Sequence, residues 1–296
     1  MTKDEALKAL SSASPHERLK GARFLSRTSQ PNDLGLLRRQ RTGETDSYVR
    51  SALDRAIANA TNQGAAKSSP TPMDDAEVPI EVRRELHSQA VRWIAGLLLH
   101  EIAGPIGLVD RAASREIEDY ERSRTHQRIQ IVQRVFGAIE HLQTAATPAK
   151  PETFDLAALI QEVVFDETSK HGLEVSQHGP KPLMVTTDPR LLRLAFCNGV
   201  RNALDAVRGI DMANGEHPVV VTWGKTDVDV WISVVDAGPG LRGPPEHAFE
   251  IGRTTKGDHS GFGLAIARQA MESLGGSVRL AKAAGGGAWF ELRWES

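Results

Sequence analysis

The sequence predicts a multidomain protein of mixed α and α/β class, in which helical domains precede a C-terminal α/β sandwich. Apolar residues recur at helical spacing through residues 1–60 and again through 78–145, and a polar segment containing Pro, Ala and Ser separates these parts. β-rich runs alternate with helical patterns over 152–296. We therefore expect a helical domain over 1–60, a linker over 61–77, a helical hairpin over 78–148 and an α/β domain over 149–296.

The composition is that of an ordinary globular protein. With 40% hydrophobic and 25% charged residues, the chain does not belong to the intrinsically disordered class, and 296 residues accommodate two or three domains. A formal net charge of -2 gives no reason to expect nucleic-acid binding. Cys197 is the single cysteine, which excludes an internal disulfide framework and a Cys-rich metal site.

The chain carries no sign of secretion or membrane insertion. Its first ten residues lack the apolar core of a signal peptide. The apolar stretch from Trp93 to Leu99 is far shorter than the roughly 20 residues that cross a bilayer. We therefore expect a cytoplasmic protein with no membrane span.

Residues 1–60 read as short amphipathic helices. Ser14 and Pro15 form a helix start, because Pro is tolerated at the first helical position. Apolar residues follow at helical spacing, such as Leu19, Ala22 and Leu25. The region resembles a pair of HEAT-type helices, which could cap the dimer, bind a protein partner or sense a state.

The region over 78–148 reads as a helical hairpin. Its first helix is apolar nearly all round, at Trp93, Ile94, Leu97, Leu98 and Leu99. The second carries a narrow apolar stripe at Ile129, Val132, Val135, Phe136, Ile139 and Leu142. Two helices cannot cover this surface alone, so we expect two copies to form a four-helix bundle in a homodimer. The alternative is a connector packed on a neighbouring domain.

Three clusters in the α/β domain predict a nucleotide site. Asn198 and Asn202 lie four residues apart and share one face of a helix that also carries Asp205, and an amide oxygen suits Mg²⁺. Asp236 follows a predicted strand, so its carboxylate can accept a hydrogen bond from an exocyclic amine, and nearby Gly238 and Gly240 permit a sharp turn.

The third cluster is a glycine-rich helix start. Gly261 and Gly263 precede Leu264 and a predicted helix, and backbone N–H groups at such a start bind anions. Lys256 adds positive charge just before it, after Thr254 and Thr255.

The order and spacing of these clusters resemble the GHKL superfamily, which contains gyrase, Hsp90, MutL and the histidine kinases. The resemblance covers Phe154 to Trp294 and implies ATP and Mg²⁺ as cofactors. It implies that Asn202 binds Mg²⁺, that Asp236 reads adenine and that the phosphates lie at the glycines. A lid would run from about Leu241 to Phe262. The candidate nucleotide-binding residues are Asn198, Asn202, Asp205, Asp236, Gly238, Gly240, Phe249 as the lid's aromatic anchor, Thr254, Thr255, Lys256, Gly261, Gly263 and Leu264.

A second resemblance favours a kinase over an ATPase. Hydrolytic GHKL members carry a glutamate general base where this sequence has Asn198, and an amide cannot accept a proton. The segment from His100 through Glu101 to Pro105 resembles the phosphoacceptor box of histidine kinases, which implies catalytic roles for His100 and Glu101. Gly104 stands where many relatives with phosphatase activity have Asn or Thr.

We interpret the chain as a sensor histidine kinase that phosphorylates His100 and passes the phosphoryl group to a separate response regulator receiver protein. Two alternatives stay open, a pseudokinase or phosphotransfer scaffold and a GHKL ATPase that acts by conformational closure. The sequence leaves undecided whether His100 is phosphorylated within one protomer or across the dimer.

Overall fold

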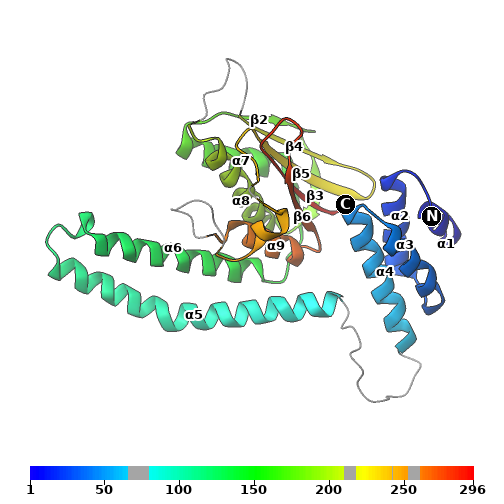
Figure 1. The fold of residues 1–296 in the computed structure, drawn as a ribbon, viewed down its shortest axis with the longest axis horizontal. Coiled ribbons are helices and arrows are strands. Elements are labelled where there is room, and N and C mark those ends of the chain that lie inside the picture. The colour runs from blue at the N-terminus through cyan, green and yellow to red at the C-terminus, as the bar shows by residue number, and fades with distance from the viewer. Residues whose placement is uncertain (66–79, 210–217, 242, 253–260) are drawn as a thin grey trace. The chain divides into compact units, whose positions relative to one another are not determined.

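The computed structural model describes residues 1–65, 80–209, 218–241, 243–252 and 261–296 (Figure 1). The chain divides into two compact units, Met1–His87 and Ser88–Ser296.

The first unit is a small helical domain. Its helices are α1 (Lys3–Ala9), α2 (Pro15–Thr28), the 3-10 helix η1 (Pro31–Asp33), α3 (Leu34–Gly43) and α4 (Ser47–Ala65). The predicted start of α2 is confirmed, since Ser14 is the N-cap and Pro15 the first helical residue. Because α4 continues to Ala65, residues 61–65 of the predicted linker are helical, and residues 66–77 lie outside the described residues. The helical pattern of α4 persists into the polar segment.

Small and branched apolar side chains form the core of this unit, at Ala6, Leu10, Leu19, Ala22, Leu25, Leu37, Val49, Ala52, Leu53, Ala56 and Ala60. A partly buried ion pair links two segments of this unit. Arg18 donates to both carboxylate oxygens of Glu44, at 2.8 and 3.1 Å, and so joins α2 to the segment that precedes α4. The helices match the predicted amphipathic pattern, while the resemblance to HEAT-type helices stays a prediction.

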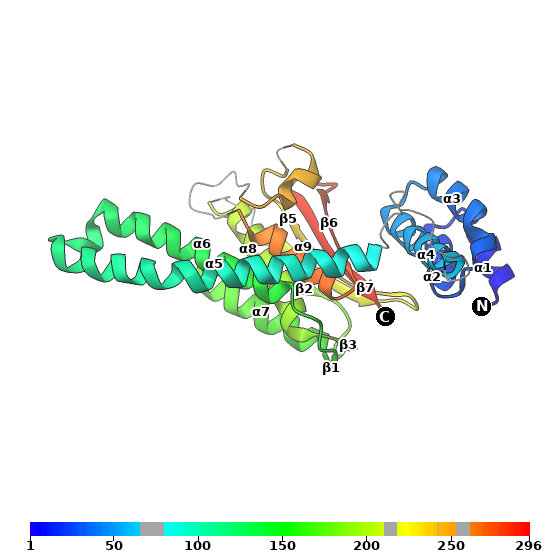
Figure 2. The ribbon, with the colours of Figure 1, turned by 90° about the horizontal axis from the view of Figure 1, so that it is seen from below.

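The second unit opens with the predicted hairpin. Helix α5 (Ile80–Glu116) and helix α6 (Arg124–Ala145) lie side by side, joined through the 3-10 helix η2 (Tyr120–Arg122) (Figures 1 and 2). Pro105 lies inside α5, which continues through it. At the turn, Tyr120 donates a hydrogen bond to Asp110, and this bond raises the pKa of Tyr120 to about 12.

The hairpin leaves much of its apolar surface exposed. Large apolar side chains with at least a third of their surface exposed include Leu86, Trp93, Ile94, Leu97, Leu98, Ile102, Leu108, Val109, Ile131 and Val132. By length and composition alone, the stretch Glu85–Glu116 could cross a membrane, with a mean hydropathy of 1.3 in its most apolar window. The expected absence of a membrane span is therefore untested.

An α/β domain follows the hairpin. Its strands are β1 (Glu152–Asp155), β2 (Val175–His178), β3 (Met184–Thr187), β4 (Val219–Lys225), β5 (Asp229–Asp236), β6 (Ser277–Lys282) and β7 (Ala288–Glu295). Its helices are α7 (Leu156–His171), α8 (Pro189–Val207), the 3-10 helix η3 (Pro245–Phe249) and α9 (Gly263–Ser273).

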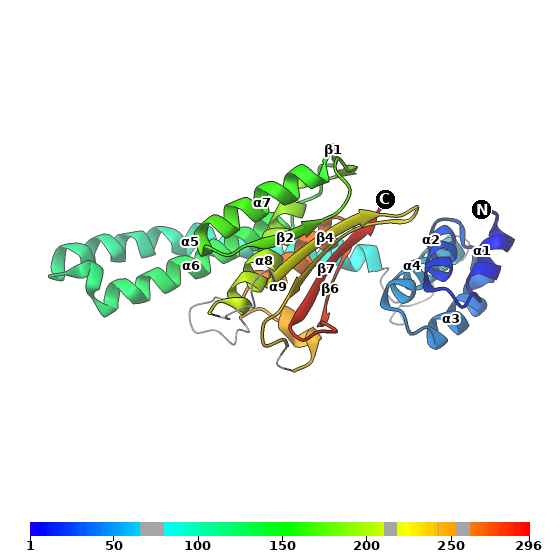
Figure 3. The same cartoon turned by 90° about the horizontal axis from the view of Figure 1, so that it is seen from above.

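Within the described residues, five strands form the main sheet in the order β2-β4-β5-β7-β6. Only the β2–β4 pair is parallel among its pairings, so the sheet is mainly antiparallel. β1 and β3 pair separately. Helices α8 and α9 lie against one face of the main sheet, and Figure 3 looks onto the strands from the other side. Layering of helices on one sheet is the predicted sandwich.

The hairpin and the α/β domain share one hydrophobic core. Ala138, Leu142 and Ala145 of α6 belong to the same buried cluster as the apolar faces of α8 and α9. Two hydrogen bonds reinforce this packing: Ser273 Oγ donates to the backbone oxygen of Ala145 at 2.7 Å, and Gln269 Nε2 donates to Ser88 Oγ at 3.0 Å. The packing agrees with the alternative that the hairpin contacts a neighbouring domain, yet it leaves the apolar surface of α5 uncovered.

Candidate functional site

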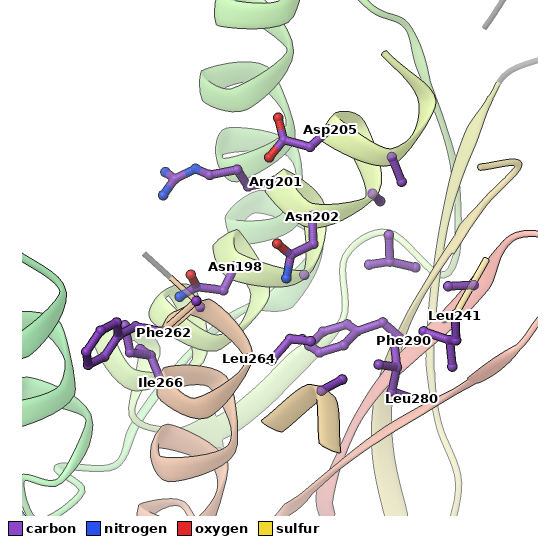
Figure 4. A pocket seen from close by; sticks show the side chains of 18 of the residues that line it. Asn198, Arg201, Asn202, Asp205, Leu241, Phe262, Leu264, Ile266, Leu280 and Phe290 are labelled. Carbon is purple, nitrogen blue, oxygen red and sulfur yellow. The ribbon is translucent and has the colours of Figure 1, made fainter. Parts of the chain in front are cut away.

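A cavity of about 730 Å³ opens between α6, α8, α9, the end of β5 and η3. Cofactor sites are typically clefts of roughly 300–1,000 Å³ with a mostly apolar lining and a few polar groups. Figure 4 shows Asn198, Arg201, Asn202 and Asp205 along one helix, with Phe262 and Leu264 at the start of α9 nearby. Of the predicted residues, the cavity brings together Asn198, Asn202, Asp205, Asp236, Gly240, Gly261, Gly263 and Leu264.

The two asparagines face the glycine-rich start of α9. Asn198 Nδ2 donates to the backbone oxygen of Leu194 at 2.8 Å, which fixes the orientation of the amide. A Cβ added at Gly263 would stand 2.9 Å from Asn198 Oδ1 and 3.9 Å from Asn202 Nδ2. Glycine at position 263 therefore lets the first turn of α9 approach the amides closely.

Asp236 ends β5 and lines the same cavity. Its Oδ1 accepts hydrogen bonds from the backbone N–H groups of Gly238 at 2.9 Å and Ala288 at 3.2 Å. These bonds hold the carboxylate in one orientation, and the residue is buried. Gly238 does not line the cavity; a side chain there would collide with Ala206, so this glycine supports the turn.

A backbone hydrogen bond links the two residues that flank the segment over 253–260. The N–H of Gly252 donates to the backbone oxygen of Gly261 at 3.2 Å. Thr254, Thr255 and Lys256 fall in that segment, outside the described residues.

Phe249, the predicted anchor of the lid, packs against α9. Its ring is buried, and the guanidinium of Arg268 on α9 lies over it, 5.5 Å from the ring centroid. Arg268 also donates to the backbone oxygen of Phe249 at 3.2 Å. Phe249 is not among the residues that line the cavity, so its place in the nucleotide-binding set stays a prediction.

Arg201 lines the cavity but is already paired. Its guanidinium donates to both carboxylate oxygens of Glu167 on α7, at 3.1 and 3.0 Å, and this pairing raises the pKa of Arg201. Its Nη2 also lies 3.4 Å from Cys197 Sγ. The pair holds α7 against α8 behind the row that carries Asn198 and Asn202.

Sequence reasoning missed one wall of the cavity. Arg134, Gly137, Ala138 and His141 of α6 line it from the hairpin side. His141 is exposed and faces this space. The four positions share one face of α6 by helical spacing. The sequence does not show that this face lines a cavity, because only the packing of α6 on α9 brings it there.

His100 and Glu101 lie on α5, and both are exposed. Neither lines the cavity. Arg92 of α5 donates to the backbone oxygen of Ala146 at 2.6 Å, and Gly96 lies beside Gln143, so the two helices run antiparallel with His100 about level with residue 139. His100 thus lies on the outer helix of the hairpin, along the same stretch as the cavity wall.

Among the residues that the structure describes, no three His, Cys, Asp or Glu side chains cluster as a metal site. A Mg²⁺ ion held by phosphate oxygens, waters and one amide oxygen needs no such cluster. Asn202 of α8, whose amide faces the start of α9, therefore fits the predicted role, and the cavity has the size and donor set for a nucleotide.

Comparison with known proteins agrees with this geometry. Residues 187–296 match the family described as histidine kinase-, DNA gyrase B-, and HSP90-like ATPase. Nitrogen regulation protein NtrY of Azorhizobium caulinodans is 28% identical over 217 residues, and sensor histidine kinase ZraS of Escherichia coli O157:H7 is 26% identical over 225 residues. Sensory histidine kinase/phosphatase NtrB of Rhizobium meliloti is 27% identical over 224 residues.

The chain is a homologue of the sensor histidine kinases. These alignments cover 67%, 72% and 66% of this kinase homologue but only 28%, 48% and 57% of NtrY, ZraS and NtrB. The solved structure of full-length ShkA in complex with AMPPNP shares the fold, with a TM-score of 0.52 at 23% identity, over 67% of this chain and 44% of that one. The kinase homologue thus combines a family ATPase domain with a preceding helical hairpin.

Proposed function

We propose that this chain is a histidine kinase that transfers the γ-phosphoryl group of ATP to His100 and then to a response regulator receiver protein. One observation carries the proposal. A nucleotide-sized cavity with the Asn198, Asn202 and Asp236 arrangement lies in the same compact unit as a helical hairpin that exposes His100.

The cavity supplies one group for each part of ATP. The oriented carboxylate of Asp236 accepts a hydrogen bond from the exocyclic amine of adenine, because its Oδ1 is already fixed by two backbone N–H groups. The start of α9 at Gly263 offers backbone N–H groups to the phosphates. Asn202 would hold Mg²⁺, which neutralises charge on the phosphates when bound.

His100 then acts as the nucleophile. A neutral ring nitrogen attacks the γ-phosphorus, an N–P bond forms, and the bond to the β-γ bridging oxygen breaks so that ADP leaves with the electron pair. The adjacent Glu101 carboxylate stabilises the positive charge that develops on the imidazole. Because His100 does not line the cavity, the ATP domain must shift along the hairpin or deliver the phosphoryl group to a second protomer.

A homodimer explains the exposed apolar surface of the hairpin. Trp93 is 70% exposed and Leu97 is 48% exposed, and both lie on the same side of α5 as His100, since seven residues make about two helical turns. Pairing with a second hairpin covers this surface in a four-helix bundle. In this arrangement His100 lies at the edge of the bundle, where a receiver can reach it.

The ionisable residues of α5 argue that this helix does not cross a membrane and that the kinase is cytoplasmic. A bilayer around Glu85–Glu116 would enclose His100, Glu101 and Asp110, and ionisable side chains inside a bilayer cost at least ~2.5 kcal/mol each. ATP and the receiver are also aqueous partners. The N-terminal unit of Met1–His87 is a candidate docking domain for a further protein.

The geometry disfavours the ATPase alternative. Asn198 stands where a hydrolytic relative would carry the general base, and its amide donates to Leu194 instead of holding a water as a base. The intact cavity likewise disfavours a scaffold that never uses ATP.

Incubation of the full chain with γ-labelled ATP and Mg²⁺ separates the three functions. A kinase gives label on the protein that is labile in acid and stable in alkali. Free phosphate without labelled protein indicates an ATPase, and the absence of both products indicates a scaffold.

Two matched variants then test the acceptor. His100→Gln should abolish the label and leave ATP binding intact, because the residue does not line the cavity. His87→Gln, another exposed histidine of α5, should label as the wild type does. Retained acid-labile label in His100→Gln would move the acceptor to another residue.

A further inference from the structure

The nucleotide cavity has a wall that comes from the hairpin, and this wall carries a positive charge. We propose that Arg134 of α6 binds the phosphate chain of the nucleotide, so that ATP bridges the hairpin and the ATP domain of one chain. The inference rests on the proposed nucleotide-binding function and adds a contact from outside the ATP domain. Arg134 is a binding and positioning residue here, and His100 remains the acceptor.

The packing of α6 on α9 sets where Arg134 lies. Ala145 at the end of α6 accepts a hydrogen bond from Ser273 at the end of α9, while earlier residues of α6 and the start of α9 line the same cavity. The two helices therefore run parallel. Each rises about 1.5 Å per residue, so counting back ten residues from each partner brings residue 135 level with Gly263. Arg134 thus lies level with the glycine-rich start of α9, the end at which the phosphates bind.

The charged side chains that line the cavity favour binding of an anion by Arg134. The cavity lining over the described residues contains two arginines, and the other one, Arg201, is held by Glu167 in a two-bond ion pair. Arg134 is exposed and makes no ion pair within the described part of the chain. A guanidinium offers several N–H donors in a planar fork, which suits phosphate oxygens.

The neighbouring side chains leave room for this contact. Gly137 and Ala138 follow Arg134 on the cavity face of α6, and a Cβ at Gly137 would meet nothing within 4 Å. Small residues keep the space between α6 and the start of α9 open for a phosphate chain. His141, one turn further on, adds a second polar group to the same wall.

This contact couples nucleotide binding to the position of the ATP domain. A ligand held by both parts stabilises the arrangement in which they are packed together, by its difference in affinity between packed and separated states. ATP, with three phosphates, therefore favours the packed arrangement more than adenosine does. Release of Arg134 from the phosphates must accompany any movement that brings the γ-phosphate to His100.

Competition binding on the full chain tests the inference. A fluorescent ATP analogue bound with Mg²⁺ is displaced by ATP or by adenosine in the wild type, Arg134→Ala, Arg134→Lys and Arg128→Ala. Arg128 is the matched control, because it is also an exposed arginine of α6 but does not line the cavity. We expect Arg134→Ala to weaken ATP about fivefold to tenfold while adenosine binds as before, since one partly exposed charged hydrogen bond is lost.

The salt dependence of ATP affinity and the two other variants give further tests of the contact between Arg134 and the phosphates. The ATP affinities of wild type and Arg134→Ala should converge as ionic strength rises, because salt screens an exposed charge. Arg134→Lys should keep part of the affinity, and Arg128→Ala should match the wild type. Equal ATP affinity in Arg134→Ala and wild type, or an equal loss for adenosine and ATP, overturns the inference. A wild type that binds no ATP instead overturns the proposed function itself.

Discussion

Asn198 Oδ1 lies 2.9 Å from the point where a Cβ on residue 263 would stand, so the amide on α8 and the glycine at the start of α9 fit together without space for a methyl group. Asn198 cannot easily turn away, because its Nδ2 is bonded to the backbone of Leu194. This contact fixes the geometry of the phosphate end of the cavity.

Gly263→Ala should therefore weaken ATP binding about tenfold, or roughly 1.4 kcal/mol, because the methyl group displaces the amide. The fold should survive, since alanine is favourable in a helix. Titration with a fluorescent ATP analogue and thermal denaturation measure the two effects. Gly285→Ala is the control, because a Cβ there meets nothing within 4 Å. Unchanged affinity in Gly263→Ala would show that the phosphates do not bind at this contact.

The two substitutions of Asp236 should separate binding from stability. Asp236→Asn keeps an oxygen that can accept from Gly238 and Ala288, so the fold should be retained while the adenine contact is lost. Asp236→Ala leaves two backbone N–H groups without this acceptor, and each costs about 1–3 kcal/mol if it stays buried. We expect both variants to lose ATP affinity and only Asp236→Ala to melt at a markedly lower temperature. Wild-type affinity in Asp236→Asn would refute the adenine contact.

Leu97→Glu should convert the full chain from a dimer to a monomer, because Leu97 is exposed on the apolar side of α5 and a carboxylate there opposes a bundle. Analytical ultracentrifugation at micromolar concentration measures the change. Phe165→Glu is the matched control, since Phe165 is 71% exposed on α7, away from the hairpin. A wild-type monomer with intact helicity would contradict the proposed bundle.

Gly104→Asn should add phosphatase activity toward the phosphorylated receiver. The position lies one helical turn after His100, so an amide there can orient a water beside the docked receiver. Gly104 is exposed and a Cβ meets nothing within 4 Å, so the new side chain fits. A positioned hydrogen bond of this kind contributes about a hundredfold to the rate of hydrolysis. The wild type lacks it, so it should release phosphate about a hundredfold more slowly than Gly104→Asn. Phosphate release from isolated phospho-receiver checks the gain; rapid release by the wild type would contradict it.

Glu44→Gln should destabilise the N-terminal unit by about 2 kcal/mol, because it removes the negative charge from a partly buried ion pair with Arg18. The hydrogen bonds from Arg18 lower the pKa of Glu44 below 4.5. A carboxyl with a lowered pKa stabilises the fold fully above its unfolded pKa, and this contribution is lost as pH falls through the folded value. Thermal melts followed by circular dichroism should show stability of the wild type falling below about pH 4.5, with a smaller fall in Glu44→Gln. An equal fall in both proteins would assign the acid sensitivity to other groups.

Local patterns in the sequence determined most of the fold and part of the candidate site. The β-rich runs over 152–296 predicted strands that are present, such as β4, β5 and β7, and Ser14 with Pro15 predicted the start of α2. The four-residue spacing of Asn198 and Asn202 placed both on one face of a helix, as found. Such features depend on side-chain periodicity and backbone preferences within a few residues, so one segment is enough to read them.

The tertiary structure alone decided which distant segments meet. It placed Arg134 and His141 of α6 in the cavity wall, and it packed Phe249 against Arg268. It also made β2 a parallel neighbour of β4, and it joined Ser273 to Ala145 across 128 residues. No periodicity records these contacts, because they follow from how whole apolar faces pack together, and a polar side chain at the edge of such a face reads as surface until its neighbour is known.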